Sequence, residues 1–329
     1  MYQNINDFQQ GMDLTQNNIK LQEQESECIW AVKAIAIFTV FFAHMPWSDS
    51  ESVMYVVFNY IGIMGVPIFL YLSGYLDYGS KRTIFYKIKW IFFPLLVYGS
   101  LTYCISLLIH YKDISSSFYL LVIDYLKWIF GCGSIYYFVP VLIACTILGR
   151  YINNYVLIVL SAVSIYLSLD YIPHNDIITR YLNPFNFLIY YCLGRISRKT
   201  RKSQIDICKK NVIGAISVFV VSIVTWDSSP TYFDLHCVFF SMSAYIILMG
   251  FLGSLSDLSF LVYIGKLSFV IYLVHIQIAG FLNTRMGGVE HIKIPVAFFV
   301  TVCFVAMLNY LISHNSKTYS YMRFWGFKK

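Results

Sequence analysis

Two ionisable residues lie in the first strongly apolar stretch of the chain, which runs from Cys28 to Trp47. Lys33 stands near its start and His44 near its end. Because ionisable side chains are costly in hydrocarbon, such residues are functional candidates that usually face the interior of a helical bundle. Eleven positions make almost three turns of an α-helix, so the two side chains share one face, about 16 Å apart along the axis.

His275 is the other histidine that falls well within an apolar stretch, and the same half of the membrane is expected to hold both. A histidine at such a depth can act as a general base, act as a nucleophile, or simply pack with its hydrogen bonds satisfied. Lys33 also has a second interpretation, because a lysine near a helix end can extend to the membrane interface without any further role.

Acidic residues are missing from the middle of every predicted span, and Asp77 lies nearest to one. Carriers coupled to protons or sodium usually place a carboxylate at the membrane midplane, so this pattern disfavours a secondary transporter. The cysteines have no metal-ligand spacing, and the common hydrolase, protease, P-loop and dinucleotide motifs do not occur. We therefore expect neither a metal nor a nucleotide cofactor bound through these motifs.

The composition predicts a membrane protein. Of the 329 residues, 58% are hydrophobic, 19% aromatic and only 12% charged, and the mean hydropathy is +0.63. Apolar segments recur along the chain without a polar block large enough to fold by itself, which indicates one membrane domain. The net charge of +7 comes from basic residues in short connections, where they set orientation, so nucleic acid is not an expected partner.

The predicted fold class is an all-α polytopic membrane protein with about ten transmembrane helices, on the rule that roughly 20 apolar residues cross the hydrocarbon. Phe118 to Phe130 is apolar but contains Asp124 and Lys127, which predicts an interfacial helix near 118–130. Prolines within or beside the spans predict that several helices are kinked. The spans are expected near residues 29–46, 53–77, 84–110, 134–150, 153–170, 181–195, 211–226, 235–254, 262–283 and 292–313.

Basic residues set the expected orientation. With both termini in the cytoplasm, 19 of the 24 lysines and arginines fall on the inner side, as the positive-inside rule favours. The predicted organisation is a disordered cytoplasmic tail over 1–27, a membrane domain over 28–314 and a basic cytoplasmic tail over 315–329. Lys33 is then on the inner side, and His44 lies toward the outer leaflet.

A basic cluster precedes the third predicted span. Lys87 and Lys89, with Lys81 and Arg82, could bind phosphate groups as point charges. They could equally serve only to orient the chain in the membrane.

Several motifs occur in an order that is similar to one known family. They are the Lys33-to-His44 spacing, G-V-P-I-F-L-Y-L-S-G-Y-L at 65–76, the pair Lys87 and Lys89 ahead of Pro94, I-Y-Y-F-V-P at 135–140, and G-K-L-S followed by Y-L-V-H over 265–275. In these the chain resembles the acyltransferase 3 family of integral-membrane, acyl-CoA-dependent O-acyltransferases, which includes bacterial sugar O-acetyltransferases. Lys33 stands where that family usually has arginine, and a lysine lacks arginine's bidentate fork. Tyr136 replaces a typical tryptophan.

The resemblance implies an acetyl-CoA or other short acyl-CoA donor that enters from the cytoplasm and binds through Lys33, Lys87, Lys89 and Tyr137. His44 would be the catalytic base, or would be acylated first and pass the group outward. The oxyanion would be stabilised by His275, Tyr137 or backbone amides. The acceptor would be a hydroxyl of a cell-surface glycan or its lipid-linked precursor, at a bacterial cytoplasmic membrane.

Two functions from other classes remain open at this point. A carrier or flippase for a glycolipid or acylated metabolite would move an unmodified substrate across the membrane without using acyl-CoA. A glycan polymerase would need lipid-linked repeat units and would leave the acyl content of the glycan unchanged. The absence of acids within the spans weakens the carrier, and the ordered motifs favour the transferase.

Overall fold

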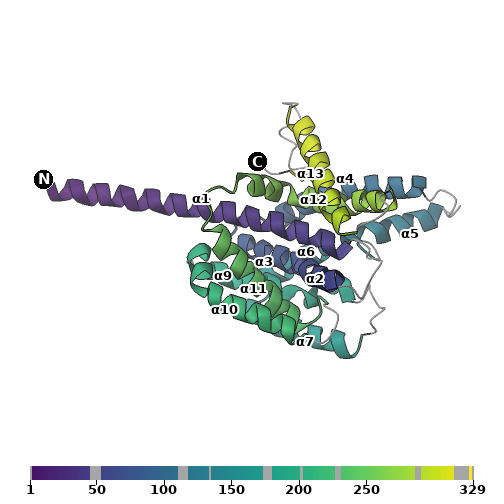
Figure 1. The fold of residues 1–329 in the computed structure, drawn as a ribbon, viewed down its shortest axis with the longest axis horizontal. Coiled ribbons are helices and arrows are strands. Elements are labelled where there is room, and N and C mark those ends of the chain that lie inside the picture. The colour runs from purple at the N-terminus through teal and green to yellow at the C-terminus, as the bar shows by residue number, and fades with distance from the viewer. Residues whose placement is uncertain are drawn as a thin grey trace.

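The chain folds into a bundle of helices (Figure 1). The computed structural model describes residues 2–44, 53–109, 118–132, 135–172, 180–200, 203–226, 231–285, 290–314 and 326–327, and no strand occurs among them. Within this part of the chain, seven helices are long and apolar enough to cross a membrane. The prediction of an all-α polytopic membrane protein is confirmed. The seven spans are Gln22–His44, Asn59–Asp77, Ile84–Leu108, Gln204–Val224, Leu235–Leu252, Ser259–Leu282 and Ile292–His314.

Ten expected spans correspond to these seven and to shorter helices between them. The helices are α1 (Tyr2–His44), α2 (Val53–Ile63), α3 (Gly65–Asp77), α4 (Ile84–Ile109), α5 (Phe118–Ile129), α6 (Phe138–Tyr151), α7 (Asn154–Asp170), α9 (Leu188–Lys199), α10 (Gln204–Val224), α11 (Leu235–Leu252), α12 (Ser259–Arg285) and α13 (Glu290–His314). Two 3₁₀ turns, η2 (Ile135–Tyr137) and η3 (Pro184–Asn186), lead into α6 and α9. Of the shorter helices, α6 and α7 are apolar, and α9 fills the place of the span expected over 181–195.

The N-terminal segment differs from the expectation. Residues 2–27, expected to be a disordered tail, are helical and continuous with the first span, and this part of α1 extends away from the bundle (Figure 1). Glutamine and glutamate are good helix formers. Lengthening an existing helix also adds hydrogen bonds without the cost of nucleation, which the composition of an isolated tail does not reveal.

The second expected span is divided. Instead of one helix over 53–77, α2 ends at Ile63 and α3 begins at Gly65. Gly65 packs directly against α1, because a Cβ at this position would lie 2.7 Å from the carbonyl oxygen of Ala36. The break lets α2 and α3 follow α1 separately.

Prolines occupy two kinds of position. Pro94 and Pro295 lie inside α4 and α13, where each removes a backbone donor. Pro67 and Pro140 lie in the first turns of α3 and α6, where the backbone N–H groups have no intrahelical partner in any case. These two residues start helices and do not interrupt them.

The helix expected near 118–130 is present as α5. It is fastened to α4 by three hydrogen bonds, because Ser100 and Tyr125 share one at 2.7 Å, the Tyr103 hydroxyl donates to the Leu121 carbonyl and the Trp128 indole donates to the Gly99 carbonyl. Its position relative to a membrane surface stays a prediction.

Glycine allows two close helix contacts that position the site. A Cβ at Gly74 of α3 would lie 2.0 Å from the Tyr191 oxygen of α9, and one at Gly194 would lie 2.0 Å from the Tyr71 oxygen. A Cβ at Gly265 of α12 would lie 1.9 Å from the Trp30 oxygen of α1. Any larger residue at these places would force the backbones apart.

Candidate active site

His44 and His275, which we call the histidine pair, lie in contact. Their ring centroids are 5.2 Å apart, although 231 positions separate them in the chain. The contact follows from the packing of α1 against α12: Gly265 lies against Trp30, and ten residues later His275 lies against His44. The two helices therefore run side by side in the same direction. The sequence analysis expected both histidines at a similar depth but did not predict that they touch.

His275 is fully buried. Its Nδ1 lies 2.6 Å from the carbonyl oxygen of Tyr272, and since a carbonyl only accepts, Nδ1 carries the proton and donates it. Nε2 has no hydrogen-bond partner among the described residues. In the neutral ring this second nitrogen is an acceptor, so the buried member of the pair presents one lone pair.

His44 differs from its neighbour because its side chain is only partly buried. Phe41 and Tyr272 enclose His275, with ring centroids 5.3 and 5.5 Å from it. Within the described part of the chain, neither histidine forms an ion pair with a carboxylate. The pair thus lacks the acidic residue that orients histidine in many catalytic triads, and a second imidazole stands beside the accessible one.

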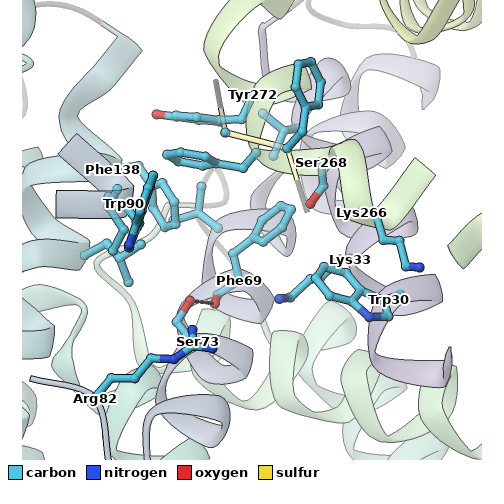
Figure 2. A pocket seen from close by; sticks show the side chains of 17 residues that line it. Trp30, Lys33, Phe69, Ser73, Arg82, Trp90, Phe138, Lys266, Ser268 and Tyr272 are labelled. Carbon is cyan, nitrogen blue, oxygen red and sulfur yellow. Dashed lines mark hydrogen bonds between the residues drawn. The ribbon is translucent and has the colours of Figure 1, made fainter. Parts of the chain in front are cut away.

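A cavity of about 430 Å³, which we call the first cavity, runs beside α1 (Figure 2). Lys33 and Arg82 lie toward one end of it and Tyr272 toward the other (Figure 2). Tyr272 also contacts His275, so this cavity ends one aromatic ring from the histidine pair. Its walls come from α1, α3, the connection from α3 to α4, α4, α6, α12 and the chain near the C-terminus. The lining residues are Trp30, Lys33, Val40, Val66, Phe69, Ser73, Arg82, Trp90, Ile91, Phe138, Leu142, Lys266, Ser268, Phe269, Tyr272, Gly326 and Phe327.

Lys33 is the predicted binding residue that lines this cavity. Its side chain is only 7% exposed, and its Nζ lies 4.5 Å from the centre of the Trp30 ring. A lysine that extended to water at the interface would be exposed, so the observed burial favours a role inside the bundle. The ammonium group instead lies at an aromatic face beside a cavity.

Lys87 and Lys89 do not line the first cavity. Lys87 forms an ion pair with Asp77, and the same carboxylate accepts from Arg195 at 2.7 Å. Lys89 is exposed, with its Nζ 5.5 Å from the Trp90 ring. The sequence could not reveal that the carboxylate at the end of α3 lies against the first turn of α4 and forms an ion pair with Lys87.

Tyr137 also lies outside the first cavity. It is 8% exposed and packs edge to face against Tyr181, with ring centroids 4.9 Å apart. The next residue, Phe138, lines the cavity instead. Tyr136 stands where the family that the chain resembles has tryptophan. Its hydroxyl shares a hydrogen bond with the Thr102 hydroxyl and donates to the Leu273 carbonyl, so it holds η2 against α4 and α12.

Several cavity residues were not among the predicted binding residues. Lys266 and Ser268 come from the G-K-L-S motif, and Ser73 comes from the second-span motif. Arg82 belongs to the basic cluster, which offered the signal that it could meet phosphate. Trp30 and Trp90 carry no signal that distinguishes them from interfacial aromatic residues. The described residues include no cluster of three or more His, Cys, Asp or Glu side chains that could hold a metal ion.

A second group of charges ties the helices together near Lys33. Glu25 of α1 bonds to the Tyr75 hydroxyl and to Arg198, and it also accepts from the backbone of Gln204. With the Asp77 group, it joins α1, α3, α4, α9 and α10. We call this region of the bundle the basic end.

Comparison with known proteins gives one match. The sequence model of an acyltransferase domain, that of the acyltransferase 3 family, matches residues 27–312. No significant match was found among curated proteins or among solved structures.

Proposed function

The chain belongs to the acyltransferase 3 family, and from this premise we propose that it transfers an acetyl group from acetyl-CoA to a hydroxyl of a cell-surface glycan or its lipid-linked precursor. The protein is an integral-membrane member of an acyltransferase family. The proposal adds the identity of the donor, the acyl group and the acceptor. The observation that carries the proposal is the first cavity, which has cations toward one end and the histidine pair beyond the other.

The donor would enter at the basic end, which we take to face the cytoplasm. Lys33, Arg82 and Lys266 line the first cavity and supply positive charge for the phosphates of CoA. The pantetheine arm would follow the apolar wall formed by residues such as Phe69 and Phe138. This brings the thioester toward Tyr272, next to the histidines. Lys33 and His44 are about 16 Å apart along α1, so a donor with a long, narrow arm fits the arrangement.

His44 would act as the general base, because it is the accessible member of the pair. It removes the proton from the acceptor hydroxyl as that oxygen attacks the thioester carbonyl. A C–O bond forms, the C–S bond breaks, and the proton held by His44 passes to the departing CoA sulfur. In the alternative path, His44 attacks the thioester and the C–S bond breaks, so that CoA departs with the imidazole proton. A hydroxyl then attacks the acyl-imidazole, the C–N bond breaks, and the hydroxyl proton returns to the imidazole.

His275 would be a positioning residue. Its Nδ1–H is committed to the Tyr272 carbonyl, so Nε2 remains to accept a hydrogen bond from an N–H group of the neighbouring imidazole. Such a contact would fix the tautomer of His44 and stabilise the cation that forms on it, the part that a carboxylate plays in a triad.

The decisive experiment measures transfer of labelled acetyl from acetyl-CoA to glycan by the purified protein in lipid nanodiscs. His44→Ala should lower the rate by about 10² to 10⁴-fold, the range for a positioned base. His314→Ala is the matched control, since His314 is exposed at the end of α13. A folded His44→Ala protein with the parental rate would refute the mechanism, and transport of unmodified glycolipid without acetyl-CoA would favour a carrier.

A further inference from the structure

A second cavity lies at the histidine end of α1. Its volume is about 300 Å³, and one of its walls is Ala43, the residue directly before His44. The first cavity touches α1 one turn earlier, at Val40. The two cavities share no described lining residue, and His44, which is not among the lining residues of either, follows Ala43 directly and Val40 by one helical turn. The second cavity is lined by Ala43, Asn59, Ile63, Arg180, Tyr181, Thr231, Tyr232 and Phe233.

Aromatic side chains form part of this wall. Tyr181 packs edge to face with Phe233 and Tyr232, with ring centroids 5.0 and 6.1 Å away. Sugar rings present a face of C–H groups with partial positive charge, which the negative face of an aromatic ring attracts. Asn59 and Thr231 add an amide and a hydroxyl that can bond with sugar hydroxyls. The lining therefore has the chemistry of a carbohydrate site.

Arg180 adds a fixed positive charge. Its side chain is 3% exposed, although it lines the cavity. Its Nη2 donates to the Ser168 and Ile172 carbonyls at 2.7 and 2.5 Å, which holds the guanidinium in one orientation. Arginine keeps its charge at every physiological pH, and its planar fork fits a carboxylate or a phosphate. None of the described residues that line this cavity is acidic.

From these features we infer that the second cavity is the acceptor site and that it takes a sugar bearing an anionic group, a carboxylate or a phosphate, which Arg180 binds. The aromatic wall holds the sugar ring, and the Ala43 side brings a hydroxyl to His44. This inference rests on the proposed function, because it requires His44 to act on the acceptor hydroxyl.

The test uses two matched pairs of acceptors with the full-length protein in nanodiscs. Methyl glucuronide against methyl glucoside tests the carboxylate, and glucose 6-phosphate against glucose tests the phosphate. The wild-type protein should favour the charged member of at least one pair. Arg180→Gln should lower kcat/KM for that charged acceptor by about 10- to 100-fold, as expected for a lost charge-assisted hydrogen bond. It should lower the value for the neutral partner much less.

Two controls separate specificity from damage. Arg285→Gln removes an exposed arginine at the end of α12, outside both cavities, and should keep the wild-type ratio. A merely structural role for Arg180 would lower both members of a pair equally, and that result would overturn the inference. So would a wild-type protein without preference between charged and neutral acceptors.

Release of CoA from acetyl-CoA distinguishes the two levels of failure. If CoA is released but none of the four sugars is acetylated, the acceptor inference is refuted and the donor half of the proposed function stands. If CoA is not released and no acceptor is modified, the proposed function itself fails.

Discussion

The two ends of the bundle use charge in different ways. At the basic end, Asp77 and Glu25 bind cations from neighbouring helices, and these contacts hold α3, α4, α9 and α10 around α1. At the histidine end, two imidazoles lie in contact and a buried arginine lines the second cavity, while Asp234, next to the cavity residue Phe233, pairs with His236. The carboxylates at the first end thus join helices of the fold, whereas Arg180 at the second end lines a cavity.

The comparison teaches that each cation of a basic cluster in a membrane protein has to be assigned separately, to a carboxylate of the fold, to solvent or to a ligand. Lys87 is paired with a carboxylate, Lys89 is exposed, and Arg82 lines the first cavity. Neighbours in sequence thus differ in use, because only packing between distant helices decides which cation a carboxylate takes up.

The largest effect is expected from Asp77→Asn, which removes the carboxylate that joins helices at the basic end. The change leaves Lys87 and Arg195 without their carboxylate in a region where Asp77 is only 7% exposed. Removing one partner of such a buried group costs about 3 kcal/mol. We expect a thermal midpoint lower by several degrees in detergent, with little change in KM for acetyl-CoA. Asp124→Asn, at an exposed site on α5, is the control and should leave the midpoint in place.

The next effect concerns the histidine end. His275→Gln should lower kcat by about 10²-fold, the loss expected when a reacting group is held in the wrong geometry. KM for acetyl-CoA should stay near the wild-type value, because His275 does not line the first cavity. Steady-state kinetics separates the two constants. A rise in KM with unchanged kcat would show that His275 supports donor binding and does not position His44.

The smallest effects compare two lysines of the same cluster of predicted binding residues. Lys33→Gln should raise KM for acetyl-CoA about 10-fold, equal to about 1.4 kcal/mol, since a cation in the first cavity is lost. Lys89→Gln should change it by less than about threefold, because Lys89 is exposed and lies outside the first cavity. Titration with acetyl-CoA measures both values. Equal rises in KM for the two variants would show that Lys89 also belongs to the donor site.

The fold could be predicted from the sequence where one segment decides its own state. The apolar runs give the membrane class, and the spacing of Lys33 and His44 gives a shared helix face without knowledge of any partner. The break before Gly65 could not be predicted, because it depends on how closely α3 approaches Ala36 of another helix. The helical state of residues 2–27 was also missed, since the composition describes that segment as though it were separate from the first span.

The candidate site shows the same limit. His44 and His275 could be selected one by one, but their contact depends on the packing of Gly265 against Trp30. Arg82 and Lys266 line the first cavity beside Lys33 only after three segments of the chain come together. Arg180 directly precedes the span expected over 181–195, and nothing in its local sequence indicates that its side chain is buried.

The parallel packing of α1 and α12 also fixes the distance between the cations of the first cavity and the histidine pair. The contacts of Gly265 with Trp30 and of His275 with His44 hold the two helices together at both ends, so the distance between the cations and the imidazoles cannot change independently. A small activated anhydride such as acetyl phosphate would reach either the cations or the imidazoles but not both. The chain would thereby distinguish activated acetyl compounds by their length as well as by their reactivity.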